Sequence, residues 1–376
     1  MMNDNNIDVL MLTASYGGGH LQAAKAMVLG LKALKPDLRI ETLDYVRWLN
    51  SALDYITRLL YVKVTSKAPL IWHILYDITD RPFFAKYSIA RKLGFGRLYN
   101  YIAVKKPKVI ISTHFFTTAV IGEMKNKGLI NIPLATIITD NIMHALWFNP
   151  NVDLYLVANE MIKKELIKKG ISPDDVKVTG IPIDLKFNHK ESKNSLRRRY
   201  NLSTELPTIL VMCGAYGMGD ILGICDYLAK HEKRLQVVVV TGKDEKLKKR
   251  ISELAFGSRN KFLVLGYVNN VFEWMGVSDL LISKAGGLTT SEALASNLPM
   301  LIYRPIPGQE EGNANYLMQA GVARVAYNME QFKEDFQYLL SQPNLLAEMS
   351  SKCSLIKKPL AALQGSKMLL DIMEIN

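Results

Sequence analysis

Cysteine is scarce in this chain of 376 residues, which contains only Cys213, Cys225 and Cys353. The three are not spaced as the ligands of a zinc site are, and three cysteines cannot build a disulfide framework. The sequence therefore predicts a reducing compartment and no structural zinc.

Signals for export and for crossing a membrane are also lacking. The N-terminus has no basic segment ahead of an apolar run, so no signal peptide is predicted. Apolar runs such as residues 237–240 and 280–282 have the length of a strand, which is too short to cross a bilayer. We expect a soluble or peripheral protein.

Acidic residues are outnumbered, since 47 Lys and Arg face 35 Asp and Glu and give a net charge of +12. Such a charge favours anionic partners, either acidic lipid or nucleic acid, unless it only confers solubility. Residues 81–108 contain eight basic residues, six aromatic residues and no acidic residue. This mixture is typical of a membrane-surface element, although a helix with a buried aromatic face and a solvated basic face has the same composition. The residues predicted to contact the membrane are Phe83, Phe84, Arg91, Lys92, Phe95 and Arg97.

No nucleic-acid-binding module accompanies these basic residues, so we expect an anionic membrane surface as the partner and no nucleic acid. The wider stretch 55–108 is predicted to bring the protein to that surface.

Two strand, glycine-loop and helix patterns divide the chain. The first is an apolar strand at 7–13, three glycines and His20, and the second is a strand at 208–212 followed by the glycine-rich residues 213–219. Each opens an alternation of strands and helices, which predicts an α/β fold of two Rossmann-like domains facing a central cleft. Further strands are expected at 39–43, 109–112, 135–138 and 154–158, and in the apolar runs near 236–240, 262–268, 279–283 and 299–303.

The domain boundary is predicted in the glycine- and proline-punctuated segment 180–189. We expect an N-terminal domain at 1–185 and a C-terminal domain at 186–354, which the family resemblance given below makes the acceptor and membrane-binding domain and the donor-binding domain. A final helix at about 355–376 is expected to pack back on the first domain.

His20 lies where a strand ends and a helix begins, directly after three glycines. An imidazole in that place is suited to act as a general base, although a helix-capping histidine is the alternative. The glycines lack the order of the dinucleotide fingerprint, which disfavours a dehydrogenase. His114, Asp140 and His144 follow presumed strand ends and are candidates for the acceptor site or the cleft, with packed or exposed histidines as the alternative.

The stretch 283–316 predicts a phosphate-bearing ligand. Gly286 and Gly287 allow a close backbone approach, and the hydroxyl residues 289–291 are expected to cap the following helix. Residues 305–313 add hydrogen-bonding groups that suit sugar hydroxyls, and the carboxylate of Glu292 is placed to reach a ribose diol.

The segments LTASYGGGHLQAAKA, ITDNIMHALWFNPNVDLYLVAN, CGAYGMGDI and SKAGGLTTSEAL together with PIPGQEEGNANY resemble the family of monogalactosyldiacylglycerol synthase and processive diacylglycerol β-glucosyltransferase, which is related to the lipid II glycosyltransferase. The resemblance covers nearly the whole chain. It implies a GT-B glycosyltransferase fold, a UDP-hexose donor, diacylglycerol as acceptor and an inverting, metal-independent transfer with no cofactor. The sequence has no Asp-x-Asp pair to clamp a metal and a diphosphate, so helix and backbone amides are expected to balance that charge.

Carried onto this sequence, the resemblance makes His20 the base that deprotonates the diacylglycerol hydroxyl. Two departures are Ala285, where proline is frequent, and Tyr216, where histidine is frequent. The donor-binding residues implied by the resemblance are Gly19, Gly214, Ala215, Gly217, Tyr267, Val268, Ser283, Lys284, Gly286, Gly287, Thr289, Glu292, Gln309, Glu310 and Asn313.

The expected activity is therefore transfer of a hexose to diacylglycerol at the cytoplasmic face of the cell membrane, by a peripheral enzyme that makes mono- and diglycosyl products. Relatives of bacterial type favour glucose over galactose. A related enzyme with another acceptor, of the lipid II type, and a UDP-sugar-binding regulator are the alternatives.

Overall fold

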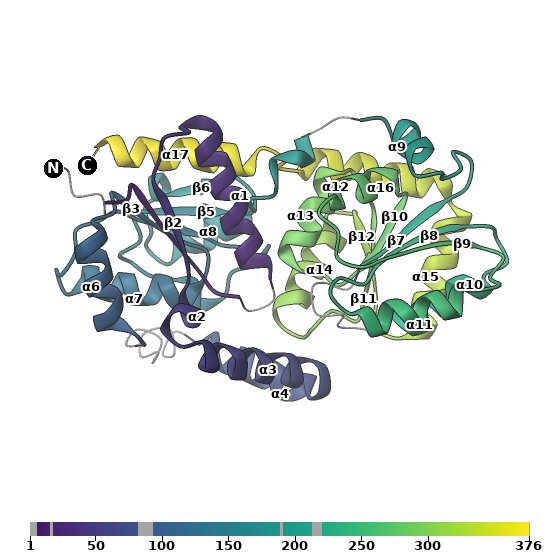
Figure 1. Cartoon of the computed structure of the whole chain (residues 1–376), viewed down its shortest axis with the longest axis horizontal. Coiled ribbons are helices and arrows are strands. Elements are labelled where there is room, and N and C mark those ends of the chain that lie inside the picture. The colour runs from purple at the N-terminus through teal and green to yellow at the C-terminus, as the bar shows by residue number, and fades with distance from the viewer. Residues whose placement is uncertain (1–5, 16–17, 82–92, 189–190, 213–219, 376) are drawn as a thin grey trace. The chain divides into compact units, whose positions relative to one another are not determined.

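The computed structural model describes residues 6–15, 18–81, 93–188, 191–212 and 220–375. The chain forms two compact units (Figure 1). The first consists of Met1–Leu185 together with Lys358–Asn376, and the second of Lys186–Lys357. Each is built around one parallel sheet of six strands.

The sheet of the first unit has the order β2-β1-β3-β4-β5-β6. Side chains alternate between its faces with the period of two that a strand imposes. In β1, for example, Leu10 and Leu12 belong to one apolar core, and Val9 and Met11 belong to the core on the opposite face. The strands are β1 (Val9–Thr13), β2 (Ile40–Asp44), β3 (Val109–Ser112), β4 (Leu134–Ile137), β5 (Leu154–Val157) and β6 (Val176–Val178).

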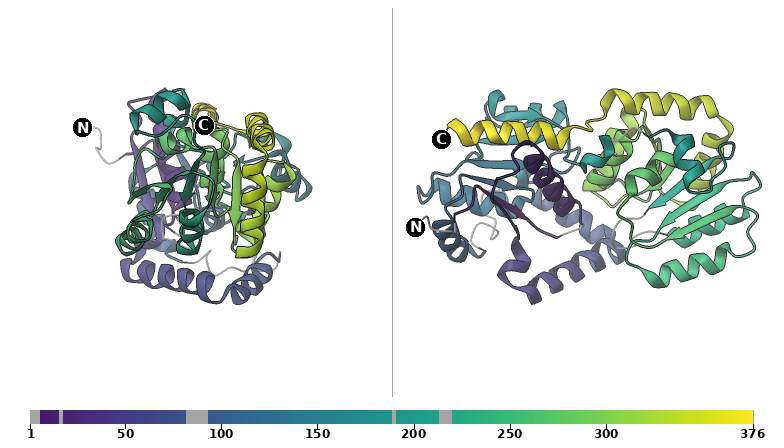
Figure 2. Two further views of the ribbon diagram at one scale, coloured as in Figure 1. Left: turned by 90° about the vertical axis from the view of Figure 1, so that its right-hand side faces the viewer. Right: turned by 45° about the horizontal axis from the view of Figure 1, so that its top comes forward.

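Helices cover both faces of this sheet, as burial of a parallel sheet requires. The helices of this unit are α1 (Gly19–Leu34), α2 (Tyr45–Leu49), α3 (Ser51–Lys67), α4 (Pro69–Thr79), α6 (Phe95–Lys105), α7 (Phe115–Asn126), α8 (Glu160–Lys168) and α17 (Ala361–Ile375), of which α3 and α4 do not cover the sheet. Among the described residues, short 3-10 helices occupy Ala145–Trp147 and Pro173–Asp175, and another, Leu185–Asn188, crosses the boundary to the second unit. Figures 1 and 2 both show α3 and α4 as a hairpin that stands off the sheet.

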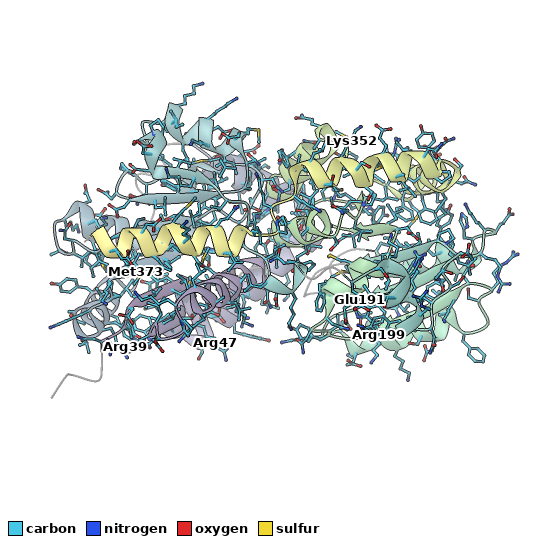
Figure 3. The ribbon with its side chains drawn as sticks, turned by 90° about the horizontal axis from the view of Figure 1, so that it is seen from above. Arg39, Arg47, Glu191, Arg199, Lys352 and Met373 are labelled. Atoms are coloured by element: carbon cyan, nitrogen blue, oxygen red, sulfur yellow. The ribbon has the colours of Figure 1, made fainter. Side chains whose placement is uncertain are left out.

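Helix α17 returns to the first unit and packs along α1. The approach is close at Gly30, where a Cβ atom would lie 2.6 Å from the carbonyl oxygen of Ala362 and 2.6 Å from Oγ of Ser366. Figure 3 shows α17, on which Met373 is labelled, lying along the first unit. Leu355 still belongs to the preceding helix, α16 (Pro343–Ile356), so the segment that returns begins after that residue.

The sheet of the second unit has the order β12-β11-β10-β7-β8-β9 and is again parallel throughout. Its strands are β7 (Thr208–Met212), β8 (Gln236–Val240), β9 (Lys261–Leu265), β10 (Leu280–Ser283), β11 (Met300–Tyr303) and β12 (Ala323–Ala326). Its helices are α9 (Lys193–Arg199), α10 (Ile221–Lys230), α11 (Glu245–Ala255), α12 (Val271–Val277), α13 (Gly287–Ala295), α14 (Gln309–Gln319), α15 (Met329–Ser341) and α16.

Strand order locates the expected ligand edge in each unit. In a doubly wound sheet, ligands bind at the carboxyl ends of strands where the order of the chain reverses. That reversal falls between β1 and β3 in the first unit and between β7 and β10 in the second. His20 follows β1 and His114 follows β3, while the glycine pair before α13 follows β10.

Two residues in the described part of the basic and aromatic stretch, Phe95 and Arg97, make contacts within the first unit. Phe95 packs against the apolar core of the first unit, and the Arg97 guanidinium donates to the carbonyl of Leu49 at 2.8 Å and lies 4.4 Å from the ring centroid of Trp48. These contacts are those of a helix packed by its aromatic face, while the membrane contact of Phe95 and of the exposed Arg97 stays a prediction. Phe83, Phe84, Arg91 and Lys92 lie outside the described residues.

Candidate active site

His20 is held by a hydroxyl group from a distant part of the chain. Its Nδ1 lies 2.8 Å from Oγ1 of Thr139, while the Thr113 hydroxyl donates to its backbone carbonyl at 3.1 Å. The residue that caps α1 is Gly18, whose φ of 83° favours glycine. His20 is thus not the cap of its helix. In the tautomer that donates Nδ1–H to Thr139, Nε2 is the ring nitrogen that can accept a proton.

The imidazole of His20 lies among other rings and one buried carboxylate. The His114 ring packs edge-on at 4.7 Å between centroids, and Trp147 lies at 6.1 Å. Burial lowers the pKa of His20, and the charge of the buried Asp140 opposes that shift. His20 is therefore neutral near pH 7, as a general base must be.

His114 is buried and caps α7. Its Nδ1 accepts the backbone N–H of Phe116 at 3.2 Å, so the proton of the neutral ring is on Nε2. Burial lowers the pKa of His114 well below its ordinary value, and the neighbouring His20 lowers it further. These contacts give His114 a part in packing and in orienting His20.

His144 caps the 3-10 helix Ala145–Trp147 in the same manner, because its Nδ1 accepts the N–H of Leu146 at 3.2 Å. Its Nε2 lies 3.3 Å from the carbonyl oxygen of Tyr76 in α4. This histidine joins two elements of the first unit, whereas the sequence had suggested an acceptor contact.

The start of α13 is open to a ligand in the second unit. Its N-cap, Gly286, makes no side-chain capping bond, and nothing lies within 4 Å of the position where its Cβ would be. The expected capping by hydroxyl residues is not found, because the hydroxyls of Thr290 and Ser291 donate to backbone carbonyls one turn back. The first amides of this nine-residue helix, with its positive dipole end, form a site suited to a phosphate.

A second loop is tied to the glycine pair by Asn313. Its side chain is fully buried and donates to the carbonyl of Ala285 at 3.0 Å, so its part is to position the loop rather than to reach a ligand. Glu310 accepts the N–H of Ile306 at 2.8 Å, and Gly308 has a φ of 82° that favours glycine. The segments 283–289 and 305–313 are therefore joined by the hydrogen bond between Asn313 and Ala285.

The other predicted donor-binding residues are placed variously. Tyr267 is 57% exposed, with the Lys243 ammonium 5.9 Å from its ring centroid, which leaves an aromatic face available to a base. Ser283 is buried at the end of β10, and Val268 packs on the core. Gly214, Ala215 and Gly217 lie outside the described residues. Those partly accessible in this unit are Lys284, Thr289, Glu292 and Gln309.

Sequence reasoning missed Thr139, Thr113 and Trp147. Thr139 and Trp147 belong to the segment ITDNIMHALW, where attention went to the acid and the histidine. A threonine directly before Asp140, at the end of a buried strand, was the available signal.

Two α/β units, each with a parallel sheet and a switch point at the carboxyl ends of its strands, make up the GT-B fold. The solved structure of MurG from Acinetobacter baumannii superimposes with a TM-score of 0.62 at 15% identity, covering 97% of this chain and 99% of that one. WaaG, a glycosyltransferase involved in lipopolysaccharide biosynthesis, superimposes with a TM-score of 0.54 at 14% identity, covering 96% and 99% of the two chains.

Sequence comparison identifies the family. Residues 20–183 match the monogalactosyldiacylglycerol synthase family, and residues 208–364 match the C-terminal domain of glycosyltransferase family 28. The processive diacylglycerol β-glucosyltransferase of Bacillus subtilis (strain 168) is 34% identical over 355 residues, which are 93% of this chain and 90% of that protein. The chain belongs to this glycosyltransferase family of monogalactosyldiacylglycerol synthases and processive diacylglycerol β-glucosyltransferases.

Proposed function

We propose that this protein transfers glucose from UDP-glucose to the free hydroxyl of diacylglycerol, with His20 as the general base. The observation that carries the proposal is the imidazole of His20, held through Nδ1 by Thr139 at the ligand edge of the first unit, in a chain of this family. The acceptor oxygen attacks the anomeric carbon as the bond to UDP breaks. The hydroxyl proton passes to Nε2 of His20, UDP leaves with the bonding electrons, and the configuration at the anomeric carbon inverts.

We propose that the second unit stabilises the negative charge of the departing UDP. The open amides at the start of α13 point a helix dipole at the site, and Asn313 holds the adjoining loop against them. A transfer that needs no metal agrees with the missing Asp-x-Asp pair.

We assign the membrane contact to the α3–α4 hairpin. Within the described residues, no helix is long and apolar enough to cross a bilayer. The hairpin instead exposes many large apolar side chains, and isolated soluble domains rarely leave such a patch uncovered. It overlaps the first part of the stretch 55–108 that the sequence indicated, and it begins four residues earlier, at Ser51. The exposed residues are Leu53, Tyr55, Ile56, Leu59, Leu60, Leu70, Ile71, Ile74 and Leu75.

A hairpin of this kind lies in the interfacial layer of a bilayer, and the net positive charge of the chain adds attraction to anionic lipid. An enzyme bound in this way meets diacylglycerol without extracting it from the bilayer. The cytoplasmic face of the membrane remains our prediction for its location.

One incubation tests donor, acceptor and product together. The purified protein is given UDP-glucose or UDP-galactose with anionic vesicles that contain diacylglycerol, and the lipids are analysed by mass spectrometry. We expect glucosyl and diglucosyl products from UDP-glucose. Folded protein that consumes neither donor would overturn the proposal and favour a UDP-sugar-binding regulator.

Replacing the base gives the matching control. His20→Ala should lower turnover at least 1,000-fold, within the range of general-base catalysis together with loss of orientation. Binding of UDP, measured by calorimetry, should change little. Normal turnover by this variant would remove His20 from the mechanism.

A further inference from the structure

The α3–α4 hairpin has few internal supports. Its two helices touch through Tyr61 and Trp72, whose rings lie edge to face at 5.2 Å. Most of its described side chains are exposed, with Asp54 and Thr65 as buried exceptions. Figures 1 and 2 show the hairpin standing off the sheet of the first unit, so its position depends on the contacts that join it to that unit.

One attachment lies at the end of α4. The Asp80 carboxylate accepts the backbone N–H of Ala145 at 2.6 Å, and Nε2 of His144 lies 3.9 Å from the same carboxylate oxygen. The His144 ring packs on Tyr76 at 4.5 Å between centroids, and its Nε2 also lies 3.4 Å from the Thr79 hydroxyl. We call these five residues the α4 latch.

The other side of the latch is the segment that holds the catalytic histidine. Residues 139–147 begin with Thr139, which bonds His20, and end with Trp147, whose carbonyl accepts the Tyr155 hydroxyl at 3.1 Å. In between, the carbonyl of Asn141 accepts the side-chain amide of Asn159 at 2.8 Å. The segment is thus fixed to the core independently of α4, and its place does not depend on the latch.

We propose that the α4 latch fixes the hairpin at a set position relative to His20, and thereby sets how deep the catalytic base lies at the bilayer surface. This inference rests on the proposed function. The hairpin enters the interface, the acceptor hydroxyl stays at the level of the lipid headgroups, and the latch holds the base at that level. A misplacement of about 1 Å can lower a reaction rate about 100-fold, so a loose hairpin should impair reaction with a membrane-bound acceptor. A short-chain acceptor dispersed in water, which can enter the site without the bilayer, should be affected far less.

The test compares Asp80→Ala with Asp80→Asn, because asparagine keeps the oxygen that accepts the Ala145 N–H and alanine does not. Turnover is measured with dioleoylglycerol in phosphatidylglycerol vesicles and with dispersed dioctanoylglycerol. We expect Asp80→Ala to lower the ratio of vesicle to dispersed turnover about 10-fold, and Asp80→Asn to stay within about twofold of the wild type. An unchanged ratio in Asp80→Ala, or an equal loss in both variants, would contradict the latch.

Hydrogen exchange gives a readout that does not need turnover. On phosphatidylglycerol vesicles, the amides of α4 should exchange faster in Asp80→Ala than in Asp80→Asn, with the amides of α1 unchanged in both. Equal exchange in α4 would refute the latch whether or not the protein is active. If the two variants show the exchange difference but the wild-type protein has no turnover, the proposed function is refuted and the latch stays in place.

Discussion

The hydroxyl of Thr139 and Nδ1 of His20 lie 2.8 Å apart, although the two residues are 119 positions apart in the chain. The contact fixes the orientation of the ring, and in the tautomer that donates Nδ1–H to Thr139 it leaves Nε2 as the proton acceptor. Here a hydroxyl orients the imidazole, whereas many enzymes use a carboxylate for that purpose. The nearby Asp140 acts on the ring through its charge, which raises the pKa of His20.

Removing that hydroxyl should slow the reaction and leave donor binding intact. Thr139→Val keeps the shape of the side chain and loses the bond, so we expect kcat to fall about 10- to 100-fold. Thr139→Ser keeps the hydroxyl and should retain most of the activity. Steady-state kinetics with UDP-glucose measures both, and equal activity in Val and Ser variants would count against the bond.

The pH dependence of the reaction should reflect the low pKa of His20. Because burial lowers that pKa, the acid limb of kcat/KM should have its midpoint below about 6.5, the ordinary value for histidine. Asp140 raises the pKa of His20, so Asp140→Asn should move the midpoint to still lower pH. A midpoint that moves upward in this variant would show that Asp140 acts in another way.

Stability should fall with acidification in a way that depends on His114. Its pKa in the fold is well below that of an unfolded histidine, so the neutral ring stabilises the fold fully above about pH 6.5 and this contribution is lost as the pH drops toward the folded pKa. His114→Asn keeps an acceptor for the α7 cap and removes the titration. Thermal unfolding between pH 7.5 and 5.5 should therefore show a smaller decrease in Tm for the variant than for the wild type.

Asn313 should matter for donor affinity through the loop that it holds. Asn313→Ala leaves the Ala285 carbonyl without its donor, at a cost of about 1–3 kcal/mol in the free energy of unfolding. We expect KM for UDP-glucose to rise more than kcat falls. Isothermal calorimetry with UDP checks this directly, and unchanged UDP affinity would separate the loop from the donor site.

Gly30→Ala tests the packing between α1 and α17, and Gly96→Ala in α6 is its control. Gly30→Ala would place a methyl group 2.6 Å from a backbone oxygen, so α17 must shift, and a loss of about 1–3 kcal/mol is expected. Gly96 has nothing within 4 Å of its Cβ position in α6, so Gly96→Ala should stabilise by about 0.4–1 kcal/mol. Denaturant unfolding compares the two, and a neutral Gly30→Ala would mean that α17 packs less closely.

The central strands of both sheets were predictable because they are continuous apolar runs. The predictions at 7–13 and 208–212 contain β1 and β7. The strands β6 and β12 were missed, since Val176–Val178 has a lysine at its centre and Ala323–Ala326 has an arginine. Both are edge strands, buried on fewer sides, where a polar residue is tolerated.

The site was predictable where its signal is local. Glycines next to His20 and before α13 mark turns that ligands approach, and both lie at the switch points. The partner of His20 was not predictable, because contact between residues 20 and 139 arises only when β1 and β4 take their places in the sheet. The hydroxyls of Thr290 and Ser291 were assigned to capping, but inside the first turns of a helix they bond the carbonyls behind them.

The return of α17 to α1 has a consequence for folding during synthesis. The apolar face of α1, with Met27 and Leu31, is completed by Leu369 and its neighbours near the other end of the chain. The second unit, Lys186–Lys357, is continuous in sequence, so it can fold before the segment that completes the first unit, Lys358–Asn376, has been synthesised. A chain truncated after residue 357 should thus have a protease-resistant second unit beside a first unit that is still open to cleavage.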